Sequence, residues 1–247
     1  MGKLLLIPTP VGNLEDITLR AIRELKACDL ILAEDTRTSG NLLRHLDISR
    51  PMRSFHIHNE HKALESIVAQ IEDLQQVGLV TDAGTPGISD PGYLLVRECI
   101  RKGIQVECLP GPVALIPALV VSGFSTDQFC FEGFLPHKKG RQTRFRKLAN
   151  EDRTIVLYES PHRLIKTLEQ AAGFMGGERR AAVVREISKK FEDVQRNSLT
   201  ELVRFYTSNP PKGEIVLVIE GAGKQKEVDQ DDDVPESSLF RAKRNKE

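Results

Sequence analysis

The sequence predicts an α/β protein of two domains. Its 247 residues, 40% of them apolar, can fill a hydrophobic core in each of two domains. Short apolar runs alternate with segments of helical periodicity, which is the order of a parallel sheet covered by helices on both faces. The alternation restarts after a Pro-Gly-Pro sequence and a small-residue helix near 114–120. We therefore expect an N-terminal α/β domain over residues 1–120, a hinge near 121–126 and a C-terminal α/β domain over residues 121–223.

The first domain is expected to contain four strands and three helices before residue 110. Largely apolar runs predict the strands at 4–7, 30–33, 79–81 and 105–109. Apolar side chains spaced three and four residues apart predict the helices at 19–25, 64–74 and 94–100.

The second domain repeats this pattern. Its strands are predicted at 128–131, 154–158, 181–184 and 215–219, and its helices at 141–148, 163–171 and 199–206. Thirteen of the 24 residues from Lys224 to Glu247 are charged, so we expect a solvated, disordered tail there.

Charge and cysteine usage narrow the function classes. The 35 basic and 35 acidic side chains balance, which excludes a polybasic protein that binds nucleic acid through bulk charge. The four cysteines form no C-x-x-C pair and are typical of buried thiols in a reducing compartment. The apolar run before Pro8 is too short for a signal peptide, and no run approaches the roughly 20 residues that span a bilayer. We expect a cytoplasmic protein with no membrane partner.

The loops that follow the four strands of the first domain share proline, glycine or clustered polar residues. They cover residues 8–13, 34–37, 82–86 and 110–112. Taken singly, each loop is an ordinary turn. Parallel strands bring all four loops to one edge of the sheet, where ligands bind, so together they predict a cleft. The loops contain neither G-x-x-x-x-G-K-[ST] nor G-x-G-x-x-G, which disfavours a kinase-like or dinucleotide site.

Seven segments resemble the signatures of one known family. They are LIPTPVGNLEDIT at 6–18, AEDTR at 33–37, VTDAGTPGISDPG at 80–92, PGP at 110–112, FEGFLP at 131–136, YESPHR at 158–163 and GEIVLV at 213–218. In this order they are similar to the ribosomal small-subunit RNA ribose 2′-O-methyltransferase I family, which belongs to the tetrapyrrole methylase superfamily. The matches run over residues 4–221.

The resemblance implies two α/β domains of the tetrapyrrole methylase type, with S-adenosylmethionine in the cleft between them, and a homodimer. It further implies methyl transfer to the ribose 2′-hydroxyl of a cytidine in the 16S RNA of the small subunit. By similarity, the residues that hold the cofactor and the nucleoside are Pro10, Val11, Asp82, Gly84, Thr85, Pro86, Ile88, Val113, Ala114 and Tyr158.

Such a reaction needs a positioned hydroxyl and a group that removes its proton. Asp35, beside Arg37 in the same loop, is our first candidate for the general base, with Glu34 and Asn13 as orienting partners. Two alternatives stay open. Asp35 and Arg37 could form a purely structural pair, and Arg37 could bind an RNA phosphate.

A basic segment is the predicted RNA contact. Residues 137–147 contain six Lys and Arg residues and no acidic residue, so a neutral protein carries a local basic patch there. We expect Lys138, Lys139, Arg141 and Arg144 to contact RNA phosphates. The alternative is a solvated helix face, the usual role of a charge run.

Metal and nucleophile chemistry are not expected. His56, His58 and His61 fit no standard zinc spacing, so a polar loop is the better interpretation. Two rival functions remain open. One is a methylase of a tetrapyrrole or another small acceptor, against which the basic segment argues, and the other is a non-catalytic RNA-binding protein that retains the cleft.

Overall fold

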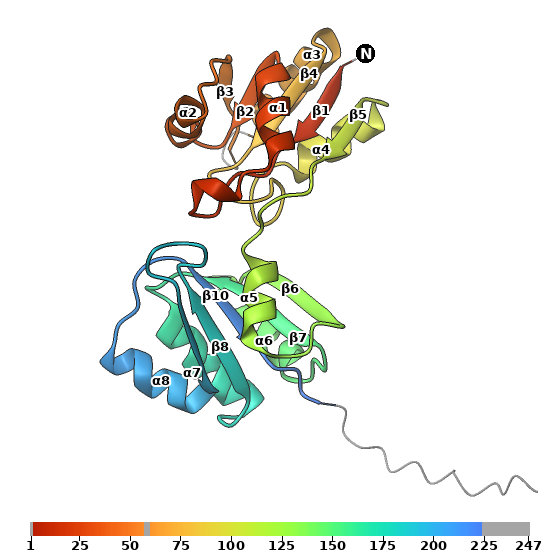
Figure 1. The fold of residues 1–247 in the computed structure, drawn as a ribbon. Helices are drawn as coiled ribbons and strands as arrows, with labels where there is room; N and C mark the ends of the chain where they lie inside the picture. The colour runs from red at the N-terminus through yellow and green to blue at the C-terminus, as the bar shows by residue number, and fades with distance from the viewer. Residues whose placement is uncertain (1, 57–59, 224–247) are drawn as a thin grey trace, which may run out of the picture.

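The computed structural model describes residues 2–56 and 60–223, and in these ranges the chain forms two domains joined by one connection (Figure 1). The predicted tail over residues 224–247 lies outside the described residues, as does His58. No helix of the two described ranges has both the length and the apolar character that crossing a bilayer requires.

The first domain is built on a parallel five-stranded sheet. Its strands are β1 (Lys3–Leu6), β2 (Leu30–Ala33), β3 (Met52–Ser54), β4 (Gln76–Val80) and β5 (Gln105–Cys108), in the order β3-β2-β4-β1-β5. Along β1, Leu4 and Leu6 enter one core cluster, whereas Leu5 and the following Ile7 enter the other. This alternation places apolar side chains on both faces of the sheet, as predicted for a sheet covered on both sides.

Helices cover both faces of this sheet. They are α1 (Leu19–Ala27), α2 (Thr36–His45), α3 (Glu60–Asp73) and α4 (Tyr93–Arg101), with a short 3₁₀ turn, η1 (Leu14–Asp16), before α1. Leu25 of α1 and Leu43 of α2 belong to one core cluster, and Ile67 of α3 and Leu95 of α4 belong to the other.

The second domain contains a mixed sheet. Its strands are β6 (Phe129–Phe134), β7 (Thr154–Glu159), β8 (Arg180–Arg185), β9 (Asp193–Ser198) and β10 (Ile215–Ile219), in the order β6-β7-β10-β8-β9. Only the β6–β7 pair is parallel among the strand pairs of this sheet in the described ranges. One face is covered by α6 (Arg141–Ala149), α7 (Leu164–Met175) and α8 (Leu199–Ser208), and the other by α5 (Leu115–Ser122).

Helix α5 belongs to the second domain. Leu115 and Leu119 pack with Val156 of β7 and Val216 of β10 in one buried cluster. The expected boundary between residues 120 and 121 therefore falls inside a packed helix. The chain instead crosses between the domains in the connection from β5 to α5 (Figure 1).

One helix and two strands of the structure were not expected, nor was the turn η1. Helix α2 contains threonine, serine and glycine, which have low helix propensity. Strand β3 has three residues and β9 is mostly polar. Both strands lie at the edge of a sheet, where a strand pairs with only one neighbouring strand and can be short or polar.

Candidate functional site

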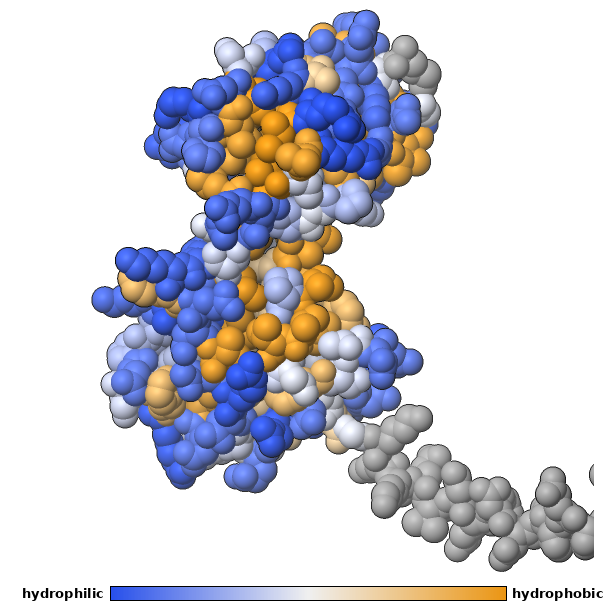
Figure 2. Space-filling model, viewed as in Figure 1, coloured by the Kyte–Doolittle hydropathy of each residue, from blue (hydrophilic) through white to orange (hydrophobic). Residues whose placement is uncertain are grey.

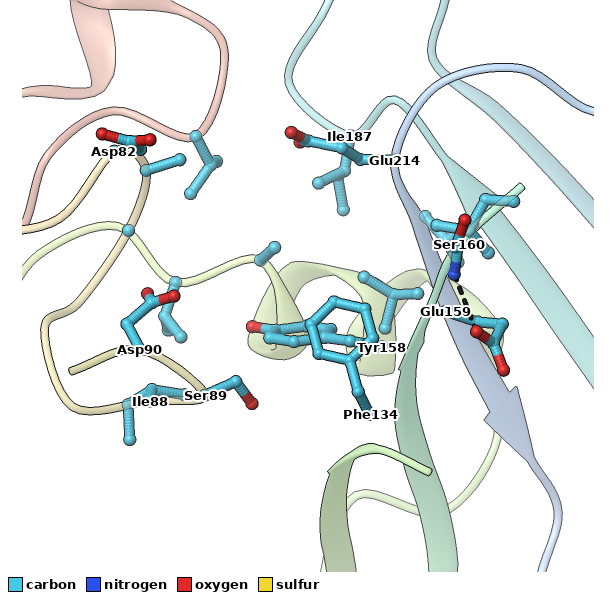
Figure 3. Close-up of a pocket in the computed structure, with 18 of the residues that line it drawn as sticks. Asp82, Ile88, Ser89, Asp90, Phe134, Tyr158, Glu159, Ser160, Ile187 and Glu214 are labelled. Carbon is cyan, nitrogen blue, oxygen red and sulfur yellow. Dashed lines mark hydrogen bonds between the residues drawn. The ribbon is translucent and has the colours of Figure 1, made fainter. Parts of the chain in front are cut away.

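A cavity of about 430 Å³ lies between the two domains (Figure 3). The first domain contributes the loops after β1, β2 and β4, and the second contributes the ends of β6 and β7 and parts of β8 and β10. Nine residues singled out from the sequence line it together: Val11, Glu34, Asp82, Gly84, Thr85, Ile88, Val113, Ala114 and Tyr158.

Hydrogen bonds tie the loops of the first domain into one rim. Thr9 and Gly84 exchange backbone hydrogen bonds of 2.9 and 3.0 Å, and Thr9 Oγ1 donates to the Thr81 carbonyl at 3.0 Å. Thr85 Oγ1 donates to the Pro112 carbonyl at 2.9 Å. These contacts join the loops after β1, β4 and β5, so the prediction that they meet at one edge is confirmed.

The second domain supplies an aromatic wall. Tyr158 packs against Phe134 with ring centroids 5.7 Å apart, and both rings line the cavity (Figure 3). Burial raises the pKa of the Tyr158 hydroxyl to about 12, so this hydroxyl stays protonated at neutral pH. Glu214 also lines the cavity and is held by Lys189 Nζ at 2.9 Å.

Three carboxyl groups line the side that belongs to the first domain. They are Glu34, Asp82 and Asp90, and burial raises the pKa of each. The effect is largest at Asp90, where burial and the charges of Glu34 and Asp82 raise the pKa to about 7. Asp90 was not among the residues expected from the sequence, although it lies in the 80–92 segment that resembles the family. A proton acceptor that titrates near neutral pH inside a cleft is a candidate for acid–base chemistry.

Asp35, the expected base, lies elsewhere and has another role. It caps α2, since Asp35 Oδ1 accepts from the Arg37 backbone amide at 2.8 Å and Oδ2 accepts from Arg37 Nη2 at 2.7 Å. Arg37 lowers the pKa of Asp35 to about 2, which leaves a weak proton acceptor. Neither residue lines the cavity. The structure thus favours the alternative of a structural pair, and it places Asn13 as the cap of η1, accepting from the Glu15 amide at 3.1 Å.

Two of the expected cofactor residues do not line the cavity. Pro86 is buried, and Pro10 lines a neighbouring groove instead. Both prolines shape the loop path rather than the cavity surface.

Arg141 is buried, which contradicts the expectation that it contacts RNA. Arg141 is 4% exposed, and its guanidinium donates to Thr167 Oγ1 at 2.6 Å and Gln170 Oε1 at 2.7 Å. Thr167 Oγ1 in turn donates to the buried Glu159 carboxylate at 2.5 Å, at the end of β7. Arg141 therefore stabilises the second domain below the cavity wall.

The other basic residues of this segment are exposed. Lys138 and Lys139 project from the turn after β6, close in sequence to Phe134 of the cavity wall. Arg144 is exposed and forms an ion pair with Glu132 at 2.8 Å. In the described ranges, no group of three or more His, Cys, Asp or Glu side chains is arranged to hold a metal ion.

Comparisons with known proteins assign the chain to a family. The model of the tetrapyrrole (corrin/porphyrin) methylases matches residues 3–203. The chain is 49% identical over 223 residues to ribosomal RNA small subunit methyltransferase I of Synechocystis sp., covering 90% of this chain and 80% of that relative. It is 44% identical over 221 residues to the protein of the same name from Thermotoga maritima, covering 90% of this chain and 99% of that relative.

Solved structures share the fold. Diphthine synthase matches with a TM-score of 0.70 at 12% identity, over 88% of this chain and 90% of that one. Uroporphyrin-III-C-methyltransferase from Thermus thermophilus matches with a TM-score of 0.62 at 20% identity, over 90% and 96%. The fold and the resemblance seen in the sequence are thereby confirmed. The chain belongs to the tetrapyrrole methylase family and, within it, to the ribosomal small-subunit RNA methyltransferase I family.

Proposed function

We propose that the protein transfers a methyl group from S-adenosylmethionine to the ribose 2′-hydroxyl of a cytidine in the 16S RNA of the small ribosomal subunit. The observation that carries this proposal is the interdomain cavity with the three carboxyl groups on its first-domain side. The names of the relatives support a methyltransferase of small-subunit ribosomal RNA. The cytidine and its 2′-hydroxyl are inferred from the motifs.

The residues of the cavity fit S-adenosylmethionine. Glu34 and Asp82 suit the positive sulfonium and ammonium groups of this cofactor. Gly84 has a φ of +86°, a left-handed conformation that glycine adopts without strain, so it permits the tight path of the loop at the rim of the cavity. When bound, the cofactor supplies a methyl group activated by its positively charged sulfur. We assign its contacts, and those to the nucleoside, to the predicted residues that line the cavity: Val11, Asp82, Gly84, Thr85, Ile88, Val113, Ala114 and Tyr158.

Asp90 is proposed to accept the proton of the ribose hydroxyl. It lies on the side of the cavity opposite the Tyr158 and Phe134 wall (Figure 3). Its pKa of about 7 matches a general base that works near neutral pH. In this role it replaces Asp35, while Glu34 and Asp82 tune its proton affinity through their charges.

Lys138 and Lys139 are proposed to bind RNA phosphates beside the cavity. Both side chains are exposed, whereas Arg141 is buried and cannot contact RNA. Arg144 is proposed as a weaker contact, because Glu132 offsets its charge.

A homodimer is proposed from the apolar surface of α5. Ile116 and Val120 are 43% and 62% exposed, and Figure 2 shows apolar residues gathered over this part of the second domain. Light scattering is expected to give twice the chain mass of 27.6 kDa. We also place the protein in the cytoplasm, since its four cysteines are free thiols.

Two measurements test the proposed function together. Calorimetry should detect binding of S-adenosylmethionine, and tritiated methyl groups should appear on unmodified small-subunit ribosomal RNA. A protein that binds no cofactor would be the non-catalytic RNA binder. A protein that labels tetrapyrroles and never RNA would be the small-acceptor methylase.

A further inference from the structure

A second cavity, of about 270 Å³, lies beside the first and takes no part in the proposed reaction. It is a groove between the loop after β1 and helix α2. Pro10 and Gly12 line this groove, whereas Val11 between them lines the main cavity. Asp82 lines both. The α2 groove and the main cavity are therefore neighbours that share one loop.

Helix α2 presents a single face to the groove. Thr38, Asn41, Leu42 and His45 follow the three- and four-residue spacing of one helix face, and all four line the groove. The side chains of Thr38, Asn41 and His45 are exposed to solvent. Arg44 Nη1 donates to Asn41 Oδ1 at 3.0 Å, which adds a positive charge at the edge.

One polar atom of the groove has no partner in the described part of the chain. Ser39 is 3% exposed and lines the groove, yet its Oγ atom makes no hydrogen bond. Buried polar groups are nearly always hydrogen-bonded, because an unsatisfied one costs free energy. The Ser39 hydroxyl therefore points to a ligand that supplies the missing partner.

We propose that the α2 groove binds the base of a nucleotide next to the methylated one. This inference rests on the proposed function, since an RNA strand with its target ribose in the main cavity has its neighbouring nucleotide close to the shared loop. Single-stranded RNA is recognised by packing of splayed-out bases and by hydrogen bonds to their edges.

The chemistry of the groove suits a base better than a phosphate. Pro10, Leu14 and Leu42 offer apolar surface for the flat faces of a base. Ser39 and Asn41 offer hydrogen bonds to its edge. The carboxylate of Asp82 would repel a phosphate, whereas it accepts a hydrogen bond from an exocyclic amino group.

Paired variants test the groove without disturbing the main cavity. Ser39→Ala removes the unpartnered hydroxyl and His45→Ala removes an exposed side chain, so both variants should fold. Each is expected to weaken binding of an unmodified small-subunit RNA fragment by about 3- to 10-fold. The turnover number and the affinity for S-adenosylmethionine should stay within about twofold of the wild type. Ser49→Ala, an exposed serine beyond α2, is the matched control.

A crosslinking experiment on the wild-type protein gives a second readout. 4-Thiouridine is placed at each nucleotide that flanks the methylated cytidine, and the irradiated complex is digested and analysed by mass spectrometry. We expect one flanking position to crosslink to a peptide of α2.

The outcomes separate the two proposals. If RNA is methylated normally and both variants bind RNA as Ser49→Ala does, the proposed role of the α2 groove is wrong and the proposed function is intact. Crosslinks that never reach α2 would lead to the same conclusion. A lower melting temperature for Ser39→Ala would also overturn it, by showing that the hydroxyl serves folding. A wild-type protein that methylates no RNA would overturn both.

Discussion

Ser89 of the first domain lies directly against Gly133 of the second, so closely that a Cβ atom at position 133 would come within 2.8 Å of Ser89 Oγ. Both residues have a positive φ, +65° and +58°. Ser89 lines the cavity, and Gly133 lies in β6 next to Phe134 of its aromatic wall. The spacing of the two domains at the cavity therefore depends on a residue without a side chain.

Replacing Gly133 should disturb the cavity at Ser89. We expect Gly133→Ala to weaken binding of S-adenosylmethionine by about tenfold, because the new methyl group displaces the Ser89 hydroxyl, which lines the cavity, and a misplaced group is costly. Calorimetry measures this affinity. Gly176→Ala is the control, since Gly176 also has a positive φ, +93°, but no atom of the described residues lies within 4 Å of the added methyl group. Equal losses of affinity in both variants would show that backbone strain alone is responsible.

Asp90→Asn should remove the proton acceptor. We expect the turnover number to fall by about 10²- to 10⁴-fold with little change in cofactor affinity. In the wild type, the rate should rise with pH as the Asp90 carboxyl, with its pKa of about 7, loses its proton. This rise should be absent in the variant. Glu98→Gln, on the surface of α4, is the control. An unchanged turnover number would remove Asp90 from the mechanism.

The same variant should affect stability in a pH-dependent way. The pKa of Asp90 is raised from 3.8 to about 7, so the folded chain binds this proton more tightly than the unfolded chain. The ionised carboxylate thus destabilises the fold progressively as the pH rises from about 4 to about 7. Asp90→Asn should raise the melting temperature at pH 8 and have little effect at pH 4. A lower melting temperature at pH 8 would contradict the burial of this charge.

Lys138→Ala with Lys139→Ala should weaken RNA binding through the loss of two phosphate contacts. The slope of log affinity against log salt is negative, and its magnitude should decrease by about 1.4 to 1.8 when these two charges are removed. Arg204→Ala, on the exposed surface of α8, should leave the slope unchanged. A slope that is the same in all three proteins would show that residues 137–147 form a solvated surface and do not contact RNA phosphates.

Arg141→Ala should instead destabilise the fold. The variant removes one of the two cations beside the buried Glu159 and the guanidinium that donates to the buried Thr167. The loss of one partner from a buried charged network costs about 3 kcal/mol or more of the free energy of unfolding. Urea denaturation measures this change. A variant as stable as the wild type would show that Arg163, which also contacts Glu159, is sufficient.

Much of the fold could be predicted from the sequence because its signal is local. Buried strands such as β2 and β10 are continuous apolar runs, and the loops after the strands contain visible turn residues. Helix α2 was missed because its propensity is low and its first turn depends on the Asp35 cap. The position of α5 was missed because an apolar helix does not reveal which of two cores it covers.

The site was predictable only in part, because it depends on residues that meet in space. Asp90 is one of several acidic residues in the sequence, and its pKa depends on Glu34, which is far away along the chain.

Arg141 differs from Lys138 in one respect that the sequence does show. It lies four residues before Phe145 and seven before Leu148 on the buried face of α6, a periodicity that a count of charges overlooks.

The most direct test of the methyl transfer is mass spectrometry of nucleosides from unmodified small-subunit ribosomal RNA after incubation with the protein and S-adenosylmethionine. We predict 2′-O-methylcytidine with the wild type and a loss of at least about 99% of it with Asp90→Asn. A methyl group on a cytosine base, or RNA that stays unmodified, would contradict ribose methylation at the interdomain cavity.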